Sequence, residues 1–113
     1  MSTDSTRACL VFTTAPDEAL AEKLAQHLVA SRLAACVKQL PASRVTYRWD
    51  GQIEHANEIP LVIVTTALAY PELERYLKGV HPYDVPEILA VDCSSGLPEY
   101  LRWATHAVCS PSS

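Results

Sequence analysis

The sequence predicts an α+β domain of the ferredoxin-like split βαβ type, in the order β-α-β-β-α-β, with a long hairpin between the second and third strands and an extra C-terminal helix. Three observations predict this fold. Short apolar runs alternate with amphipathic stretches, a hairpin signal stands near the middle of the chain, and a last amphipathic stretch follows the fourth strand. Because 113 residues suffice for one core, we expect a single domain over 1–113 with flexible tails at 1–7 and 110–113.

The first strand and the first helix are predicted at the start of the chain. CLVFTT (9–14) is a short apolar run with β-branched residues at its end, which is typical of a buried strand. A helix over 16–32 follows, with Thr14 as its expected cap and Pro16 in its first turn. Its apolar stripe is formed by Leu20, Ala21, Leu24, Ala25, Leu28 and Val29.

AACVKQLP (34–41) is predicted as the second strand, and an alternating stretch follows it. Val45, Tyr47 and Trp49 alternate there with polar residues, which marks a strand with one solvated face. Flat amphipathic rings of this kind are enriched where subunits meet, so we interpret Tyr47 and Trp49 as interface residues.

A tight hairpin joins this stretch to the third strand. Asp50-Gly51 is a strong turn signal, because both residue types tolerate positive φ. The returning strand covers 52–66, and its Pro60 predicts an edge position or a bulge, since proline cannot donate a ladder hydrogen bond. Arms that reach from about 45 to 66 are longer than a sheet of short strands can cover. We therefore expect further copies of the chain to shelter the exposed edges, in a ring.

The second half of the chain supplies two helices and the fourth strand. A helix over 70–79 begins with Pro71, a strand covers 87–93, and a last helix covers 96–108. HPYDVPE (81–87) connects the first of these helices to the strand. Its two prolines fix φ and constrain the residues before them, so the connection should be a rigid bend.

Composition excludes several classes of partner. Nine basic against thirteen acidic residues give a net charge of −4 without any cluster of Lys and Arg, so neither nucleic acid nor a membrane surface is an expected partner. The apolar runs are too short for a signal peptide or a membrane span, and we expect a cytoplasmic protein. The four cysteines form no Cys-x-x-Cys pair, and we interpret them as reduced thiols.

Motifs of known enzyme classes are missing as well. The chain has no Gly-rich phosphate loop, no nucleophile elbow and no His-Glu-x-x-His helix. Asp84 and Glu87 could form an acid and base pair, but no nucleophile is marked beside them. We therefore predict a protein that is not an enzyme and that needs no organic cofactor.

Five motifs in the same order resemble the CutA divalent-cation tolerance proteins. They are TAPD (14–17), AACV (34–37), YRWDG (47–51), HPYDVPE (81–87) and YLRW (100–103). The resemblance runs from about Val11 to Val108. It implies a ferredoxin-like homotrimer whose long hairpins wrap neighbouring subunits, and a role in tolerance to copper and other divalent ions without an agreed reaction. The implied trimer is also similar to that of the PII-type signalling proteins, which bind small ligands in clefts between subunits.

The chain departs from the family pattern at three places. The family usually carries Lys-Thr near the end of the third strand, where this chain has Val64-Thr65, so a charge that could balance Glu58 or Glu87 is lost. Some relatives carry a Cys and a paired His where this chain has Thr13 and Val80. Soft ligands that favour Cu(I) are therefore few.

His81, Glu87 and Cys36 are the candidate metal ligands. Imidazole suits copper, zinc and nickel, and Glu87 could add a carboxylate if the prolines fold the loop back. Cys36 could add a sulfur near a subunit cleft. The alternatives are that His81 terminates the preceding helix and that Cys36 is a core thiol. We expect weak binding of Cu(II) or another divalent cation, completed by a second subunit. The alternative function is a regulatory or scaffold trimer whose cleft receives a small ligand or a protein.

The remaining candidates are structural or interface residues. Pro86 fixes the bend, the Tyr83 hydroxyl needs a partner if it is buried, and Glu87 should be paired or face a ligand. Glu58 could pair across subunits, and Trp103 belongs to the last helix motif.

Overall fold

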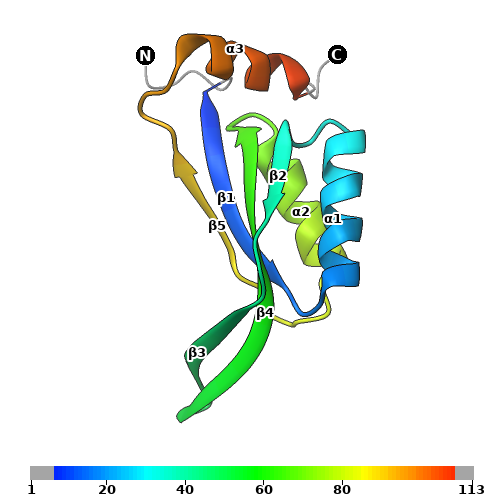
Figure 1. The fold of residues 1–113 in the computed structure, drawn as a ribbon, viewed down its shortest axis with the longest axis vertical. Helices are drawn as coiled ribbons and strands as arrows, with labels where there is room; N and C mark the ends of the chain where they lie inside the picture. The colour runs from blue at the N-terminus through cyan, green and yellow to red at the C-terminus, as the bar shows by residue number, and fades with distance from the viewer. Residues whose placement is uncertain (1–6, 109–113) are drawn as a thin grey trace.

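The computed structural model describes residues 7–108 and confirms the predicted α+β, ferredoxin-like order (Figure 1). The expected tails and Cys109 lie outside the described residues, apart from Arg7. In chain order the elements are β1 (Ala8–Ala15), α1 (Glu18–Ala30), β2 (Cys36–Gln39), β3 (Ser43–Trp49), β4 (Gln52–Thr66), α2 (Tyr70–Val80), β5 (Ile88–Asp92) and α3 (Pro98–Ala107).

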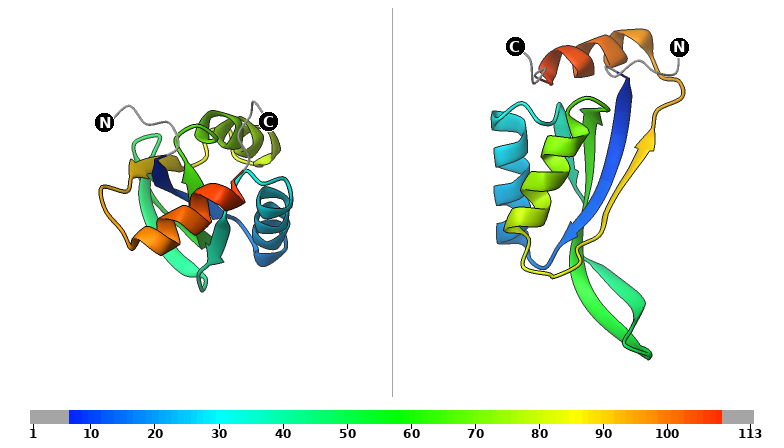
Figure 2. Two further views of the ribbon diagram at one scale, coloured as in Figure 1. Left: turned by 90° about the horizontal axis from the view of Figure 1, so that it is seen from above. Right: turned by 180° about the vertical axis from the view of Figure 1, so that it is seen from behind.

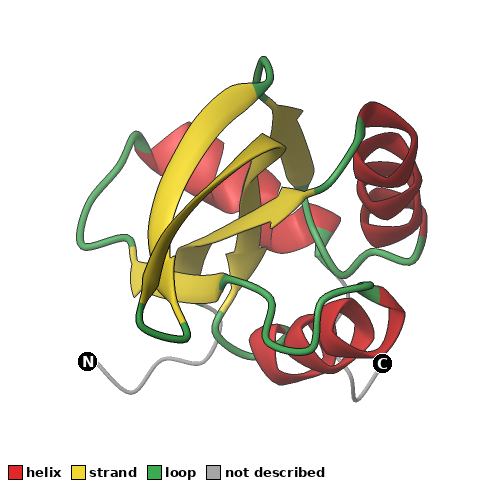
Figure 3. Ribbon diagram, turned by 90° about the horizontal axis from the view of Figure 1, so that it is seen from below, coloured by secondary structure: helices red, strands yellow, loops and turns green. Residues whose placement is uncertain are grey.

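The sheet has the strand order β2-β4-β1-β5, and every pairing in it is antiparallel. β3 pairs with β4 alone, so these two strands leave the sheet as a long hairpin arm over residues 43–58 (Figure 1). Asp50 and Gly51 both have positive φ, 54° and 76°, which confirms the predicted turn. The view from below shows how strongly the strands twist (Figure 3).

Helices α1 and α2 cover one face of the sheet, and α3 lies across the end of the molecule opposite the arm (Figure 2). Alternate residues of the central strands point at α1 and α2, among them Val11, Leu61 and Ile63. They meet Leu24 and Leu28 of α1 and further leucines of α2. Each fully buried side chain of this kind contributes roughly 1.5–3 kcal/mol, so this layer stabilises the fold of the single chain.

Over most of its length, the opposite face of the sheet is covered by no helix of the described chain (Figure 1). Leu10 and Phe12 of β1 point to this side, with Val91 and Leu89 of β5 as their partners in register. Leu89 is 60% exposed and Val91 48%. The single chain thus presents an apolar strip to solvent, and β5, although its residues are mostly apolar, is not a buried strand.

The first helix begins later than predicted. Thr14 belongs to β1, where it pairs with Pro60, and the cap is Asp17, whose Oδ1 accepts a hydrogen bond from the Leu20 N–H at 2.8 Å. The pairing of β1 with β4 continues to Ala15, so the chain cannot turn into a helix at Thr14.

Pro60 lies in the central strand β4, so of the two predicted alternatives the edge position is wrong and the bulge is confirmed. Its carbonyl accepts a hydrogen bond from the Leu40 N–H at 2.9 Å, and the missing N–H points to the same side. There the pairing is irregular: Gln39 faces Leu61 while Ser43 faces Glu58. Residues 40–42 therefore oppose only two residues of β4, and this bulge between β2 and β3 accommodates the proline.

Candidate functional site

The loop 81–87 leaves α2 and returns to the sheet beside the end of β1. The His81 backbone N–H donates to the Leu77 carbonyl at 3.0 Å, which closes the helix. His81 itself is extended, with φ −75° and ψ 139°, as expected for a residue before a proline. The chain therefore turns sharply out of the helix and brings the loop over Thr14.

The His81 ring holds this loop to the sheet. Its Nε2 lies 2.7 Å from the Thr14 carbonyl oxygen, and its Nδ1 lies 3.2 Å from the Tyr83 backbone nitrogen. Because a carbonyl can only accept, Nε2 carries the proton and Nδ1 accepts from the Tyr83 N–H. The side chain is only 8% exposed, and both ring nitrogens are engaged. A metal ion at His81 would have to replace one of these hydrogen bonds.

Tyr83 and Glu58 form the second polar link. The Tyr83 hydroxyl donates to Glu58 Oε2 at 2.9 Å, which confirms that this hydroxyl has a partner. Burial, together with the hydrogen bond to the carboxylate, raises the pKa of Tyr83 to about 12. Glu58 is 8% exposed, and within residues 7–108 no ion pair reaches its carboxylate. Burying a carboxylate without a neighbouring cation costs free energy, so a positively charged partner would stabilise Glu58.

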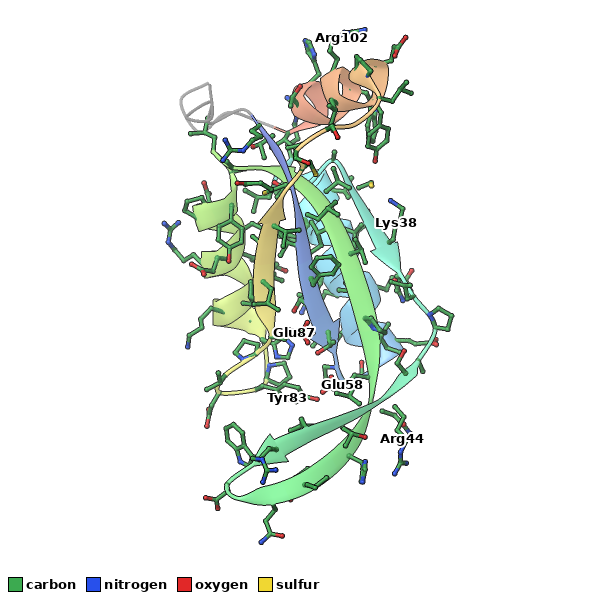
Figure 4. The ribbon with its side chains drawn as sticks, turned by 90° about the vertical axis from the view of Figure 1, so that its left-hand side faces the viewer. Lys38, Arg44, Glu58, Tyr83, Glu87 and Arg102 are labelled. Atoms are coloured by element: carbon green, nitrogen blue, oxygen red, sulfur yellow. The ribbon has the colours of Figure 1, made fainter. Side chains whose placement is uncertain are left out.

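A pocket of about 420 Å³ opens in the angle between the arm, the end of the sheet and the loop. The arm contributes Val45, Tyr47 and Trp49 from β3 and Glu58 from its base in β4, and the sheet contributes Thr14. The remaining lining residues, from the loop, are Tyr83, Asp84, Val85 and Glu87. Figure 4 shows Glu58, Tyr83 and Glu87 together at the base of the arm. Three aromatic rings and three carboxylates thus face one space, and among residues 7–108 no Lys or Arg lines it.

The structure brings five of the predicted site residues to this pocket: Tyr47, Trp49, Glu58, Tyr83 and Glu87. Sequence reasoning gave no ligand role to Thr14 or Val85, which also line it. Pro86 lies in the same loop, half-buried. Glu87 is exposed and lies just before the first residue of β5. Within one chain its side chain therefore faces the pocket and solvent.

Cys36 and Trp103 lie elsewhere, beside α3. Cys36 Sγ is 3.7 Å from the Tyr100 hydroxyl oxygen and 3.9 Å from Lys38 Nζ. The Trp103 ring packs on Tyr100 with 5.4 Å between centroids. Within one subunit the three predicted metal ligands are therefore not one site. Among residues 7–108, no three His, Cys, Asp or Glu side chains converge as metal ligands.

Val64, which stands where the family usually has Lys, is also remote from the pocket. It lies six residues along β4 from Glu58, roughly 20 Å at the rise of a strand. Val64 is buried in a cluster with Ala104 and Val108, next to Cys36. A lysine here could not have balanced Glu58 within one subunit.

Sequence comparison with known proteins finds one family and relatives that carry its name. The chain matches the family described as CutA1 divalent ion tolerance protein over residues 9–107. It is 42% identical over 96 residues to the divalent-cation tolerance protein CutA of Pectobacterium atrosepticum, covering 85% of this chain and 87% of the relative. It is 43% identical over 94 residues to that of Thermus thermophilus, covering 83% and 91%. These relatives are named for cation tolerance and not for an enzymatic reaction.

Solved structures agree with the sequence relatives. CutA from Xylella fastidiosa superposes with a TM-score of 0.87 at 46% identity, over 91% of this chain and 99% of that one. A CutA from Archaeoglobus fulgidus, described as periplasmic, gives a TM-score of 0.85 at 31% identity, over 88% and 97%. Within residues 7–108, no helix has the length and apolar character to cross a membrane.

Proposed function

The chain belongs to the CutA1 divalent ion tolerance family, and from that premise we propose that it binds divalent cations weakly in a cleft completed by assembly into a homotrimer. Its function is binding and not catalysis. The observation that carries the proposal is Glu58, a carboxylate only 8% exposed that no cation of the described chain neutralises.

The pocket supplies further oxygen ligands. Asp84 and Glu87 line it together with Glu58, and carboxylate oxygens bind divalent ions from Mg²⁺ to Cu²⁺. For a given set of ligands, Cu(II) binds most tightly among the first-row divalent ions, which supports copper as the first metal to test. His81 is a less suitable ligand than the sequence suggested, because both of its ring nitrogens already have partners.

Three carboxylates that share a pocket without converging do not complete a coordination sphere. Further ligands would have to come from another copy of the chain or from water. This requirement, and the weak affinity that goes with it, supports a cleft between subunits over a site built by one chain.

The arm and the open sheet face support the homotrimer. Trp49 is 57% exposed and Ile53 64%, on a two-stranded arm that would be marginally stable alone in water. The apolar strip of Leu89 and Val91 lies on the sheet face that no helix covers. Burial of these surfaces against other copies removes apolar area from water and supplies the free energy of association.

Isothermal titration calorimetry with Cu(II) and with Zn(II) tests the cation site. Glu58→Gln and Glu87→Gln should each weaken binding, because each removes one carboxylate from the pocket. The matched control is Glu22→Gln, which makes the same change in net charge on the exposed side of α1 and should bind like the wild type. Curves for both pocket variants that coincide with the wild type would remove the proposed site.

Light scattering tests the assembly. Shortening the arm around Asp50-Gly51 should lower the mass from that of three chains, or prevent folding, because the arm would no longer reach its neighbour. A well-folded variant that retains the mass of a trimer would contradict the proposed role of the arm. The wild type run as a monomer in dilute solution would overturn the homotrimer itself.

We also place the protein in the cytoplasm. Cys9, Cys36 and Cys93 are free thiols, which suits a reducing compartment. The relative from Archaeoglobus fulgidus is described as periplasmic, so fractionation of cells, with the chain detected by antibody, is the direct test. Recovery in the periplasmic fraction would refute this location.

A further inference from the structure

The aromatic wall of the pocket is not explained by a metal ion. Tyr47 and Trp49 come from the arm and Tyr83 from the loop, so two distant segments each place rings beside Glu58. A divalent ion is held by oxygen, nitrogen or sulfur atoms and needs no ring faces. The rings, and the two valines beside them, suit a ligand that has carbon as well as charge.

The charge of the pocket selects the sign of that ligand. Glu58 lies at its base, and the Tyr83 hydroxyl fixes one carboxylate oxygen at 2.9 Å. The other oxygen has no hydrogen-bond partner among residues 7–108 and is available to a ligand. Asp84 and Glu87 add negative charge on the loop side, and none of the Lys and Arg residues in the described part of the chain lines the pocket. An anionic ligand would meet only repulsion here.

We propose that this pocket binds an organic cation, with an ammonium or guanidinium head at Glu58 and its apolar part against Tyr47, Trp49 and Val45. Ring faces attract such cations, and a carboxylate behind the rings adds a direct ion pair. The volume of about 420 Å³ lies within the usual range for small-ligand sites. The proposal concerns the same pocket as the cation site but does not require that a metal ion binds.

Two sources could supply this chemistry. One is a free small molecule in the cell. The other is a Lys or Arg side chain from a second copy of the chain, which would bring the same charged head to Glu58 during assembly. Both sources predict that binding of the cation requires the negative charge of Glu58. They differ in whether a small cation added to the assembled protein can enter the pocket.

The test uses tetramethylammonium as the probe and Trp49 as the reporter. The chain has two tryptophans, so a Trp103→Phe background leaves Trp49 as the single tryptophan, which is excited selectively at a wavelength where tyrosine does not absorb. Titration in EDTA, at constant ionic strength, should give a saturable change in Trp49 emission. Neutral tert-butyl alcohol, which has nearly the same shape, should give none at equal concentration.

Variants define the contribution of each wall. Glu58→Gln should weaken tetramethylammonium binding about tenfold or more, because it removes the buried member of the ion pair. Tyr47→Leu should weaken tetramethylammonium binding about two- to fivefold, which is the effect of one ring face. This variant tests the pocket even if Glu58→Gln does not fold. Glu22→Gln, on the exposed side of α1, should bind like the background protein.

The outcomes separate the sources and the two proposals. Saturable binding that depends on Glu58 supports a free organic cation. No binding, combined with a lower assembly mass for Glu58→Gln by light scattering, supports a cation supplied by a second copy. No binding together with an unchanged assembly overturns the inference. A Cu(II) titration that still depends on Glu58 would in that case leave the metal proposal standing alone.

Discussion

Replacing His81 with alanine distinguishes a structural histidine from a metal ligand. The substitution removes the hydrogen bond from Nε2 to the Thr14 carbonyl and the one that Nδ1 accepts from the Tyr83 N–H. Each contributes about 1 kcal/mol net. His81 is also only 8% exposed, and loss of its ring leaves a cavity between the loop and β1. Together these losses should lower the free energy of unfolding by about 2–4 kcal/mol.

Urea unfolding followed by far-UV circular dichroism measures this loss. All samples are compared at one protein concentration, because the stability of an assembling protein depends on concentration. The measurement is made in EDTA and repeated with Zn(II). If His81 ties the loop to the sheet, the loss is the same in both conditions, since no metal takes part in either hydrogen bond.

The matched control is His106→Ala on the exposed side of α3, which should change the free energy of unfolding by less than about 0.5 kcal/mol. A loss at His81 below about 1 kcal/mol would refute the hydrogen-bond reasoning. A loss of unfolding free energy that appears only with Zn(II) would also refute this reasoning, because it would identify His81 as a metal ligand.

Three further outcomes follow from the geometry. Asp17→Ala removes the side-chain cap of α1 and should cost about 1 kcal/mol in urea unfolding, with no change in the pocket. Leu77→Ala, at a fully buried position of α2, should cost about 2–5 kcal/mol in the same assay. Burial and hydrogen bonds to Glu74 and Glu58 raise the pKa values of Tyr70 and Tyr83 to about 12. An unfolded tyrosine loses its proton near pH 10, whereas these two tyrosines keep theirs in the folded state up to about pH 12. Deprotonation therefore favours the unfolded state, and the melting temperature should fall between pH 10 and pH 12. The fall should be less steep in Tyr83→Phe, which has one such tyrosine fewer.

The features that sequence predicted well are the local ones. The turn at Asp50-Gly51 depends on two residue types that tolerate positive φ, and the structure has positive φ at both. The alternation of Val45, Tyr47 and Trp49 placed three side chains on one face, and all three line the pocket. Such signals are contained in a few consecutive residues, so no knowledge of the fold was needed to recognise them.

The features that sequence missed depend on contacts between distant segments. Thr14 and Asp17 are both suitable caps, and only the length of the β1–β4 pairing decides between them. His81 was recognised as important, but its partner is a carbonyl 67 residues away, and carbonyls leave no mark in a sequence. The burial of Glu58 similarly follows from where the arm leaves the sheet and the loop returns.

The arm links the two proposals physically. It supplies Tyr47 and Trp49 to the pocket, yet it pairs with no strand outside the hairpin itself, so its position relative to the loop is weakly fixed in a lone subunit. Other copies that hold the arm in place would preorganise the pocket and strengthen cation binding there. Linkage is reciprocal, so a cation that joins Tyr47 and Trp49 to Glu58 must strengthen assembly by the same factor. Measuring the free energy of assembly with and without the cation therefore tests the coupling directly. If a cation bound at Glu58 left the stability of the trimer unchanged, the arm would already be rigid without it.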